Sequence, residues 1–563
     1  MMPVLPDIDD LSLAAQAAQM VVVRTTGHLF DHEIQYPDWE ADRASLSYAL
    51  ESLGIGGVIL LGGSAAEVGL RSQQLQSQSD IPLLIAADIE EGVGQRFSGA
   101  TWFPPPMALG EIAGTDITGA DVTGADATRA IALAEAFGEA TAQEALAIGL
   151  NWILAPVVDV NNNPENPVIN VRAFGESPAL VAALAEGFIR GSQRHPVLTT
   201  AKHFPGHGDT ALDSHVALPT LNHSLNRLKA IELPPFQRAI AAGVDAVMTA
   251  HVNLPAVDQT HPATLSAAIL TGLLRRDLGF DGLIVTDALI MGAIADRYGP
   301  YEAAILAIEA GADILLMPAD PAGTIAAVIE AVTIGRLSRQ RVRASVERIW
   351  RAKLKVAAAY NPVSHHPHAW EQIQPAPVNL NHLAQPQVRQ WASDILSASQ
   401  QLRGTISDSP QQACLPARNL IVVDDLLDCQ FLGRTAPAIA HPRERGYSLH
   451  IADSRTLPPK DTPLESLSTL MQVFIRGNPF RSVTPLTQLA EAWLQWLIQS
   501  NTLQGLVIYG SPYVRDRFLP QISDTLPFGF TYGQMPEAQA ILLANLFTDR
   551  TSSETKRDRI FTD

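Results

Sequence analysis

Residues 132–159, ALAEAFGEATAQEALAIGLNWILAPVVD, contain one complete helix-to-strand unit and decide the fold. The first part, 132–149, is rich in alanine and places its apolar residues at helical spacing. The second part, 152–159, is apolar on both faces and ends in an acidic residue, Asp159. Strands that are apolar on both faces and alternate with helices are typical of a parallel sheet covered by helices.

The same unit recurs along about the first 350 residues. Eight short apolar runs indicate buried strands: MVVV near 20, GVILL at 57–61, LLIAAD at 83–88, WILAPVVD at 152–159, LTTAKH at 198–203, AVMTAH at 246–251, LIVTD at 283–287 and ILLMP at 314–318. Eight strand–helix units in a segment of this length predict a (β/α)8 barrel of the TIM type.

Several of the runs end in residues that are capable of chemistry, namely Asp88, Asp159, Lys202–His203, His251 and Asp287. In a TIM barrel, the loops that follow the C-terminal strand ends form the active site. Any one of these residues is explained equally well as a solubilising loop charge. The five positions together favour an active-site rim.

The rest of the chain predicts a second domain. Segment 341–360, RVRASVERIWRAKLKVAAAY, is typical of an amphipathic helix that closes the barrel domain, residues 1–360. A Pro- and His-rich linker is expected over 361–386. Residues 387–563 begin with a helix and predict a smaller α/β domain with a mainly parallel sheet, from the strand-like segments 419–425, 471–476 and 505–510.

Composition excludes some classes of function. Lys plus Arg number 39 against 58 Asp plus Glu, a net charge of −19 that repels nucleic acid and anionic lipid. The two cysteines, Cys414 and Cys429, form neither a disulfide framework nor a metal-finger pattern and fit a reducing compartment. With an acidic N-terminal segment and no apolar run of roughly 18 residues, we expect a cytoplasmic protein without membrane or nucleic-acid partners. The oligomeric state is not specified by these features.

Segment 202–215, KHFPGHGDTALDSH, follows a strand directly and concentrates three His, two Asp and one Lys. One hypothesis is a metal site, with His203 and His207 four residues apart. Asp209, Asp213 and His215 would then complete the shell. However, Pro205 and the two glycines break the helix that normally presents such a pair, so we expect no metal.

The other hypothesis for this segment is an acid/base pair. In an extended DSH tripeptide, side chains two residues apart project to the same side, so Asp213 can reach His215. The carboxylate would orient the imidazole, which ordinarily titrates near pH ~6.5 and can both give and take a proton. A helix-capping Asp beside an exposed His is the ordinary alternative for an isolated DSH.

With its complete KHFPGHG…DSH loop, the first 350 residues or so resemble glycoside hydrolase family 3, in its β-N-acetylglucosaminidase branch. The resemblance implies that His215 is the general acid/base, assisted by Asp213, and that Lys202 and His203 hold sugar hydroxyls. IVTDALIMGAI implies Asp287 as the catalytic nucleophile, with Ala288 where many relatives have a second Asp.

The resemblance extends to three further strand ends. DIEEGVGQRF matches the family with Asp88 and Arg96, and Val93 replaces an arginine that is usual in that turn. NVRAFG supplies Arg172, which the resemblance places against the sugar or its acetamido group, and TAHVNLP supplies His251 near the site.

The implied reaction is a retaining double displacement on terminal N-acetylglucosamine of β-glycosides, such as peptidoglycan fragments. It requires no metal or organic cofactor. A phosphorylase using the same residues is the alternative, because an imidazole repels incoming phosphate less than a carboxylate does. A catalytically silent sugar-binding protein is the alternative from another class.

Overall fold

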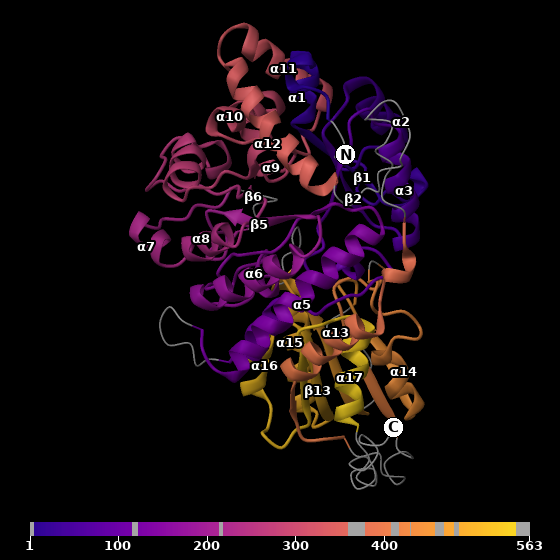
Figure 1. Ribbon diagram of the computed structural model, residues 1–563. Coiled ribbons are helices and arrows are strands. Elements are labelled where there is room, and N and C mark those ends of the chain that lie inside the picture. The colour runs from indigo at the N-terminus through magenta and orange to yellow at the C-terminus, as the bar shows by residue number, and fades with distance from the viewer. Residues whose placement is uncertain are drawn as a thin grey trace. The chain divides into compact units, whose positions relative to one another are not determined.

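The computed structural model describes residues 5–114, 122–212, 218–357, 378–406, 416–427, 429–456, 467–477 and 484–547. The chain divides into two compact units, Met1–Trp391 and Ala392–Asp563, and Figure 1 shows both with their elements labelled. Most of the expected linker, 361–386, lies outside the described residues.

The first unit is a nearly closed parallel barrel. Its strands follow the order β7-β6-β5-β4-β3-β2-β1-β8, and β1 pairs with both β2 and β8. A parallel bridge between Val285 and Ile314 brings the β7 end of the sheet to the β8 end. The strands are β1 (Val21–Thr26), β2 (Gly57–Leu61), β3 (Leu84–Ala87), β4 (Trp152–Ile153), β5 (Leu198–Phe204), β6 (Ala246–Thr249), β7 (Leu283–Val285) and β8 (Leu315–Leu316). All eight coincide with predicted runs, so the predicted barrel is confirmed.

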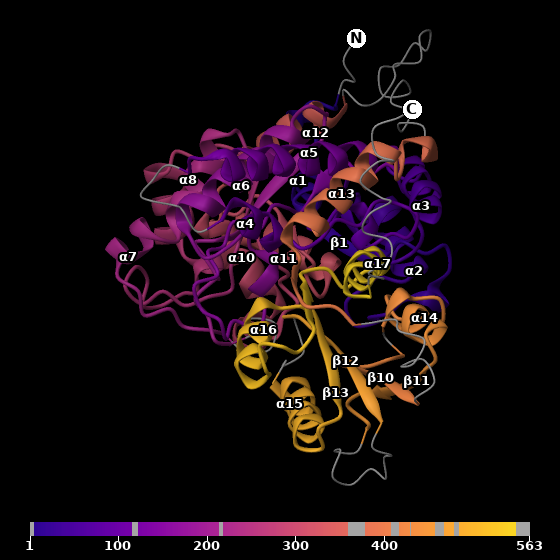
Figure 2. The ribbon, with the colours of Figure 1, turned by 90° about the horizontal axis from the view of Figure 1, so that it is seen from below.

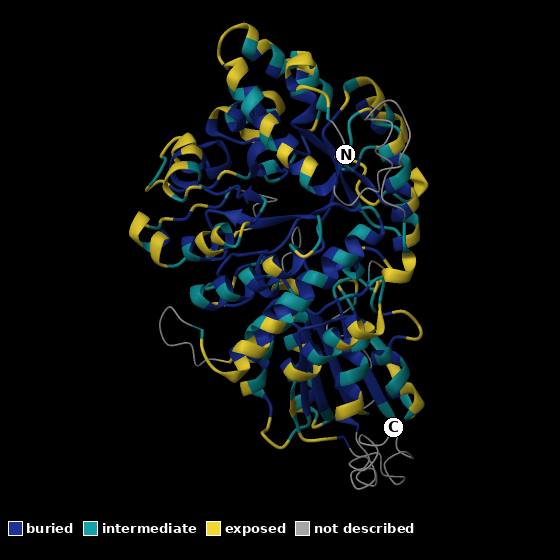
Figure 3. Ribbon diagram, viewed as in Figure 1, coloured by how far each residue is buried: buried dark blue, intermediate teal, exposed yellow. Residues whose placement is uncertain are grey.

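Helices surround this barrel, and Figure 3 shows its strands buried while the outer faces of the helices are exposed. They include α1 (Leu13–Gln19), α2 (Arg43–Ser47), α3 (Ala65–Ser77), α4 (Met107–Ala113), α5 (Ala125–Ala147), α6 (Pro178–Ser192), α7 (Leu225–Ala230), α8 (Leu233–Ala241), the π-helical η3 (Tyr48–Leu53) and η7 (Ala268–Asp277), α9 (Gly292–Tyr298), α10 (Pro300–Ala310), α11 (Pro321–Thr333) and α12 (Arg339–Ala357). The closing helix expected at 341–360 is α12.

Helix α5 contains the helical part of the stretch 132–159 that predicted the fold. It packs along α6 (Figures 1 and 2). Two glycines permit this contact. A Cβ on Gly138 would lie 2.0 Å from the carbonyl oxygen of Phe188, and one on Gly191 would lie 1.9 Å from that of Glu135. Only residues without a side chain let the two backbones approach this closely.

The second unit has one six-stranded sheet in the order β11-β10-β12-β13-β14-β9, with only β9 antiparallel. The strands are β9 (Gln401–Arg403), β10 (Ala417–Val422), β11 (Tyr447–Ala452), β12 (Ser468–Ile475), β13 (Leu503–Gly510) and β14 (Phe528–Thr531). The helices are α13 (Pro386–Ser399), which crosses the division between the units, α14 (Pro437–Glu444), α15 (Thr484–Gln499), α16 (Pro512–Phe518) and α17 (Pro536–Leu546). The mainly parallel sheet was predicted, whereas β9, β11 and β14 were not.

Two further observations bear on the sequence-based expectations. No helix among the described residues combines the length and apolar character that crossing a bilayer requires. Burial raises the pKa of the Cys429 thiol to about 11, which makes it a poor nucleophile, and Cys414 lies outside the described residues.

Lys353 of α12 is a buried ammonium group with a neutral partner. The residue is 2% exposed, and its Nζ donates a hydrogen bond to Gln19 Oε1 at 2.6 Å. The ring of Trp350 lies 5.7 Å from Nζ. Burial lowers the pKa of Lys353 from 10.5 to about 7. Between these two values the unfolded chain binds more protons than the folded one, so this residue makes stability rise with pH.

We therefore expect Lys353→Met to raise the thermal midpoint relative to wild type at about pH 6.5, and to raise it less at about pH 9.5. The variant also removes the hydrogen bond to Gln19, a loss that is the same at both pH values, so the pH-dependent difference isolates the buried charge. Thermal unfolding of both proteins across this range is the measurement. An equal midpoint difference at the two pH values would show that Lys353 keeps its ordinary pKa.

Candidate active site

The chemically capable strand ends gather at one rim of the barrel. Asp88 follows β3, Lys202 and His203 end β5, and Asp287 comes two residues after β7. Because all eight strands are parallel, their C-terminal ends meet at the same end of the barrel. The sequence-predicted rim is therefore one continuous surface.

Lys202 is the centre of a buried charge cluster at this rim. Its Nζ lies 2.8 Å from Asp88 Oδ1 and 2.6 Å from Glu90 Oε1, and its side chain is 1% exposed. Glu90 also accepts a bidentate pair of hydrogen bonds from the Arg172 guanidinium, with Nε to Oε2 at 2.7 Å and Nη2 to Oε1 at 2.8 Å. Two cations and two carboxylates thus neutralise each other, and of the four only Asp88 is substantially exposed.

The charges in this cluster are fixed at neutral pH. Burial by itself raises the pKa of Glu90, but the charges of Arg172 and Lys202 outweigh it and hold that pKa well below its usual range. Burial lowers the pKa of Lys202, yet the neighbouring Asp88 and Glu90 raise it overall. Asp88 differs from its partners because its side chain is 38% exposed, so its carboxylate can accept hydrogen bonds from a ligand at the rim.

The two arginines expected to bind sugar occupy different environments. Arg172 has its guanidinium directed at Glu90 and donates from Nη1 to the Val168 carbonyl at 3.0 Å. Arg96 is held beside the cluster through Nε, which donates to the carbonyl oxygen of Asp88 at 3.0 Å. Both lie next to Asp88, and their contacts with sugar stay a prediction.

Asp159, after β4, organises the start of the 202–215 loop. Its fully buried carboxylate lies 2.8 Å from His203 Nδ1 and accepts the His207 backbone N–H at 2.7 Å. With Nδ1–H donated to Asp159, His203 Nε2 is the nitrogen available to a sugar hydroxyl. The carboxylate thereby fixes both the ring orientation and the tautomer of His203.

His207 is a structural residue of this loop. Burial lowers its pKa to about 4, so the imidazole is neutral at physiological pH, and Nδ1 lies 2.8 Å from Thr210 Oγ1. Asp209 lies 2.9 Å from His223. The side chains of His203, His207 and Asp209 thus contact three different groups, namely Asp159, Thr210 and His223. Asp213 and His215 lie outside the described residues.

Two glycines let the loop pack against its neighbours. Gly206 has a φ of 130°, a conformation that L residues with side chains rarely adopt. A Cβ on Gly208 would lie 1.8 Å from the carbonyl oxygen of Val160, in the segment that follows Asp159. The loop therefore lies directly on the backbone after β4.

We expect Gly208→Ala to displace this loop and to lower kcat by at least about tenfold, since misplacing a catalytic group by an ångström is costly. Steady-state kinetics, with circular dichroism to confirm folding, is the measurement. Gly433→Ala is the matched control, because a Cβ there meets nothing within 4 Å. Wild-type kinetics in Gly208→Ala would show that the position of the loop does not matter.

Asp287 is half-buried, and its immediate surroundings fix its backbone. Its N–H donates to Thr249 Oγ1 of β6 at 3.3 Å, and its Oδ1 accepts the Ala288 N–H at 2.7 Å.

His251 is fully buried, with Nε2 at 3.0 Å from the Ala288 carbonyl and Nδ1 at 2.8 Å from Thr264 Oγ1. The described contacts place His251 beneath the Asp287–Ala288 turn, and a direct sugar contact stays a prediction. The negative charge of Asp287 also acts on His207, which connects this turn to the loop after β5.

Sequence reasoning missed Glu90, and it noted Asp159 as a rim residue without giving it a role in the site. The sequence did contain a signal for Glu90, because residues two apart in an extended segment face the same side, as Asp88 and Glu90 do. Asp159 had none beyond its place at a strand end, because its partners come from a segment more than 40 positions later in the chain.

Comparisons with known proteins agree with this geometry. The glycosyl hydrolase family 3 N-terminal domain matches residues 12–352, and the bacterial glycosyl hydrolase family 3 C-terminal domain matches residues 411–548. β-Hexosaminidase A of Pseudoalteromonas piscicida is 35% identical over 342 residues, which is 55% of each chain, so the match spans about half of that relative. The β-hexosaminidase of Chromobacterium violaceum is 37% identical over 286 residues, covering 50% of this chain and 76% of that one.

Solved structures are similar to this chain along nearly its whole length. The family 3 β-N-acetylglucosaminidase from Paenibacillus sp. str. FPU-7 superposes with a TM-score of 0.73 at 30% identity, covering 95% of this chain and 96% of that one. Together with the family match to more than half of its residues, this likeness shows that the chain belongs to glycoside hydrolase family 3.

Proposed function

We propose that this protein is a retaining β-N-acetylhexosaminidase that removes terminal N-acetylglucosamine from β-glycosides. The observation that carries the proposal is the meeting, at one barrel rim, of the Lys202–Asp88–Glu90–Arg172 cluster with Asp287. The cluster offers a half-exposed carboxylate supported by buried cations, which suits sugar hydroxyls. The relatives named β-hexosaminidase and β-N-acetylglucosaminidase support the choice of sugar.

In the proposed first step, a carboxylate oxygen of Asp287 attacks the anomeric carbon and forms an ester-like glycosyl bond. The glycosidic bond breaks, and its oxygen leaves as an alcohol after taking a proton from His215. In the second step, water loses a proton to His215 and attacks the same carbon, which frees Asp287. Two inversions at one carbon give overall retention.

The remaining residues bind and orient the sugar in this scheme. Lys202, Asp88 and His203 contact hydroxyls, Arg172 contacts the sugar or its acetamido group, and Arg96 binds the sugar from beside Asp88. Asp213 orients His215 and stabilises its protonated form. Glu90 and Asp159 hold Lys202, Arg172 and His203 in place without reacting. No metal or organic cofactor has a step in this scheme.

The natural substrate we propose is an N-acetylglucosamine-containing fragment of peptidoglycan, cleaved in the cytoplasm during cell-wall recycling. The low cysteine content supports this compartment. Activity on purified cell-wall disaccharide, together with fractionation of cells for the protein itself, would test both parts. Recovery of the protein outside the cytoplasm would contradict the location without affecting the chemistry.

One assay tests the chemistry. The expected result is rapid release of the aryl group from an aryl N-acetyl-β-glucosaminide, little release from the matching glucoside, and the same rate with or without phosphate. Phosphate-dependent turnover that yields a sugar 1-phosphate would establish the phosphorylase instead. Sugar binding without turnover of either glycoside would establish a silent binding protein.

A further inference from the structure

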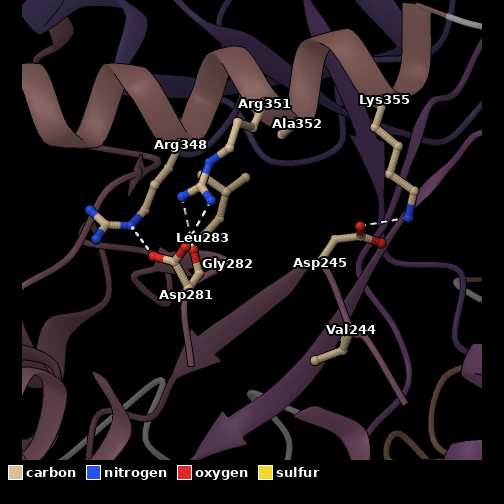
Figure 4. A pocket seen from close by; sticks show the side chains of 9 residues that line it. All are labelled: Val244, Asp245, Asp281, Gly282, Leu283, Arg348, Arg351, Ala352 and Lys355. Carbon is tan, nitrogen blue, oxygen red and sulfur yellow. Dashed lines mark hydrogen bonds and ion pairs between the residues drawn. The ribbon is translucent and has the colours of Figure 1, made fainter. Parts of the chain in front are cut away.

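A pocket lies at the opposite end of the barrel from Asp287. It has a volume of about 220 Å³ and sits at the N-terminal ends of β6 and β7, under one face of α12. Figure 4 shows Arg348, Arg351 and Lys355 reaching down from the helix. Asp281 and Asp245 face them from the segments that precede the two strands.

The ion pairs in this pocket leave N–H groups unused. Arg351 Nη1 lies 2.7 Å from Asp281 Oδ2, and Lys355 Nζ lies 2.5 Å from Asp245 Oδ1. Each pair uses only part of the donor capacity of its cation, because a guanidinium has five N–H groups and an ammonium three. The side chains of Arg351 and Lys355 are 58% and 34% exposed, so their remaining donors can reach a ligand in the pocket.

Arg348 is shared between two carboxylates at long distances. Its Nε is buried without a hydrogen bond and lies 3.5 Å from Asp281 Oδ1, and its Nη1 lies 3.4 Å from Asp313 Oδ1. Asp313 is fully buried behind the pocket and is also contacted by Arg275 and Arg341. Three guanidinium groups therefore share one carboxylate.

The charges around the pocket do not balance. The cations that line it are Arg348, Arg351 and Lys355, and the carboxylates are Asp245 and Asp281, a formal surplus of one positive charge. The whole chain, by contrast, carries a net charge of −19.

Helix composition alone is not sufficient evidence for a site. Helix α12 has seven Lys and Arg against one Glu, and cations near a helix C-terminus are favoured by its dipole. The distinguishing observation is that three of these cations line one pocket together with Gly282 and Leu283. Arginine and lysine N–H groups in such a space are the donors that oxyanions prefer.

We propose that this pocket binds a small dianionic oxyanion, either inorganic phosphate or the phosphoryl group of a phosphate monoester. The anion would lie between Arg351 and Lys355 and accept their unused N–H groups, and its negative charge would offset the surplus of positive charge. Because the pocket joins α12 to β6 and β7, occupancy would stabilise the barrel. Competition with substrate is not expected, since the sugar-binding cluster lies at the other end of the strands.

The test is thermal unfolding of the full chain in increasing inorganic phosphate, with total ionic strength held constant by sodium chloride. We expect the midpoint of wild type to rise saturably, by about 2 °C or more when the ligand greatly exceeds its dissociation constant. The double variant Arg351→Gln/Lys355→Gln should weaken the response by at least about tenfold in phosphate concentration. A parallel titration with a hexose 6-phosphate distinguishes free phosphate from a phosphate monoester as the preferred ligand.

Two controls keep the result decisive. Arg343→Gln removes a cation of the same helix that pairs with Asp9 and Glu347 outside the pocket, so its response to phosphate should equal that of wild type. If the double variant does not fold, the single variant Lys355→Met replaces it. A response to phosphate that persists unchanged in the pocket variant, or no saturable response in wild type, would overturn the proposal. Neither outcome depends on glycosidase activity, which is measured separately and should be the same in all these variants.

Discussion

Asp287→Asn is expected to lower kcat on an aryl N-acetyl-β-glucosaminide by at least about 10³-fold, because an amide cannot form the covalent glycosyl intermediate. The substitution is close to isosteric. The oxygen of the new amide can still accept the Ala288 N–H that Asp287 Oδ1 accepts at 2.7 Å, so the turn should keep its shape. Substrate binding, measured by calorimetry with a non-hydrolysable analogue, should therefore change little while turnover is lost.

Asp277→Asn is the matched control for this variant. Asp277 is a surface carboxylate whose side chain is 55% exposed and pairs with the exposed Arg276, so its loss should leave kcat unchanged. Full activity in Asp287→Asn would show that another group is the nucleophile and would remove the basis of the double displacement.

Glu90→Gln is expected to damage both stability and substrate binding. Glu90 is 4% exposed at its side chain and neutralises Lys202 and Arg172 together. Removing one partner of a buried ion pair costs about 3–5 kcal/mol, because the charge that remains is left uncompensated away from water. We also expect KM to rise by at least about tenfold, because Lys202 and Arg172 lose the group that orients them.

The pH dependence follows from the depressed pKa of Glu90. Its stabilising contribution is fully present above the ordinary pKa of 4.5 and is lost only as the pH falls through its lower value in the folded protein. The stability gap between wild type and Glu90→Gln should therefore be constant near neutrality and close in strong acid. Chemical unfolding at several pH values measures this gap.

Glu135→Gln is the control for Glu90→Gln, because Glu135 also pairs with two arginines but does so at the surface. Its partners Arg190 and Arg194 each have side chains that are 50% exposed, so we expect a loss of no more than about 1 kcal/mol. If the two variants behaved alike, burial of the cluster would not be the source of its strength.

The barrel could be predicted because its strands are buried on both faces and each contains an apolar run. An apolar run predicts burial better than it predicts strand pairing, as β4 and β8 show. The run at 152–159 is eight residues long, yet the ladder covers only Trp152–Ile153, and the following residues stay buried without it. In the second unit, β9 and β11 are edge strands in which nearly all positions are partly or fully exposed, so they lack this signal.

The position of the strand-end residues at one rim could be predicted from the sequence, but Glu90 and the contacts within the cluster could not. The strand ends indicated that Asp88, Lys202 and Asp287 share one rim. That Glu90 joins Lys202 to Arg172 depends on a contact across 82 positions of the chain, which no local spacing encodes. For the same reason, the surplus of cations under α12 becomes visible only when the helix is seen against the N-terminal ends of β6 and β7.

The most direct test of the central claim is to identify the covalent intermediate. The protein would be incubated with a slow-turnover fluorinated N-acetylglucosaminyl fluoride, quenched in acid, digested and mapped by mass spectrometry. The double displacement predicts one fluorinated N-acetylglucosaminyl adduct on the peptide that contains Asp287, and none in Asp287→Asn. An adduct on a different residue, or retention of configuration without any adduct on the protein, would contradict the role of Asp287 as the nucleophile.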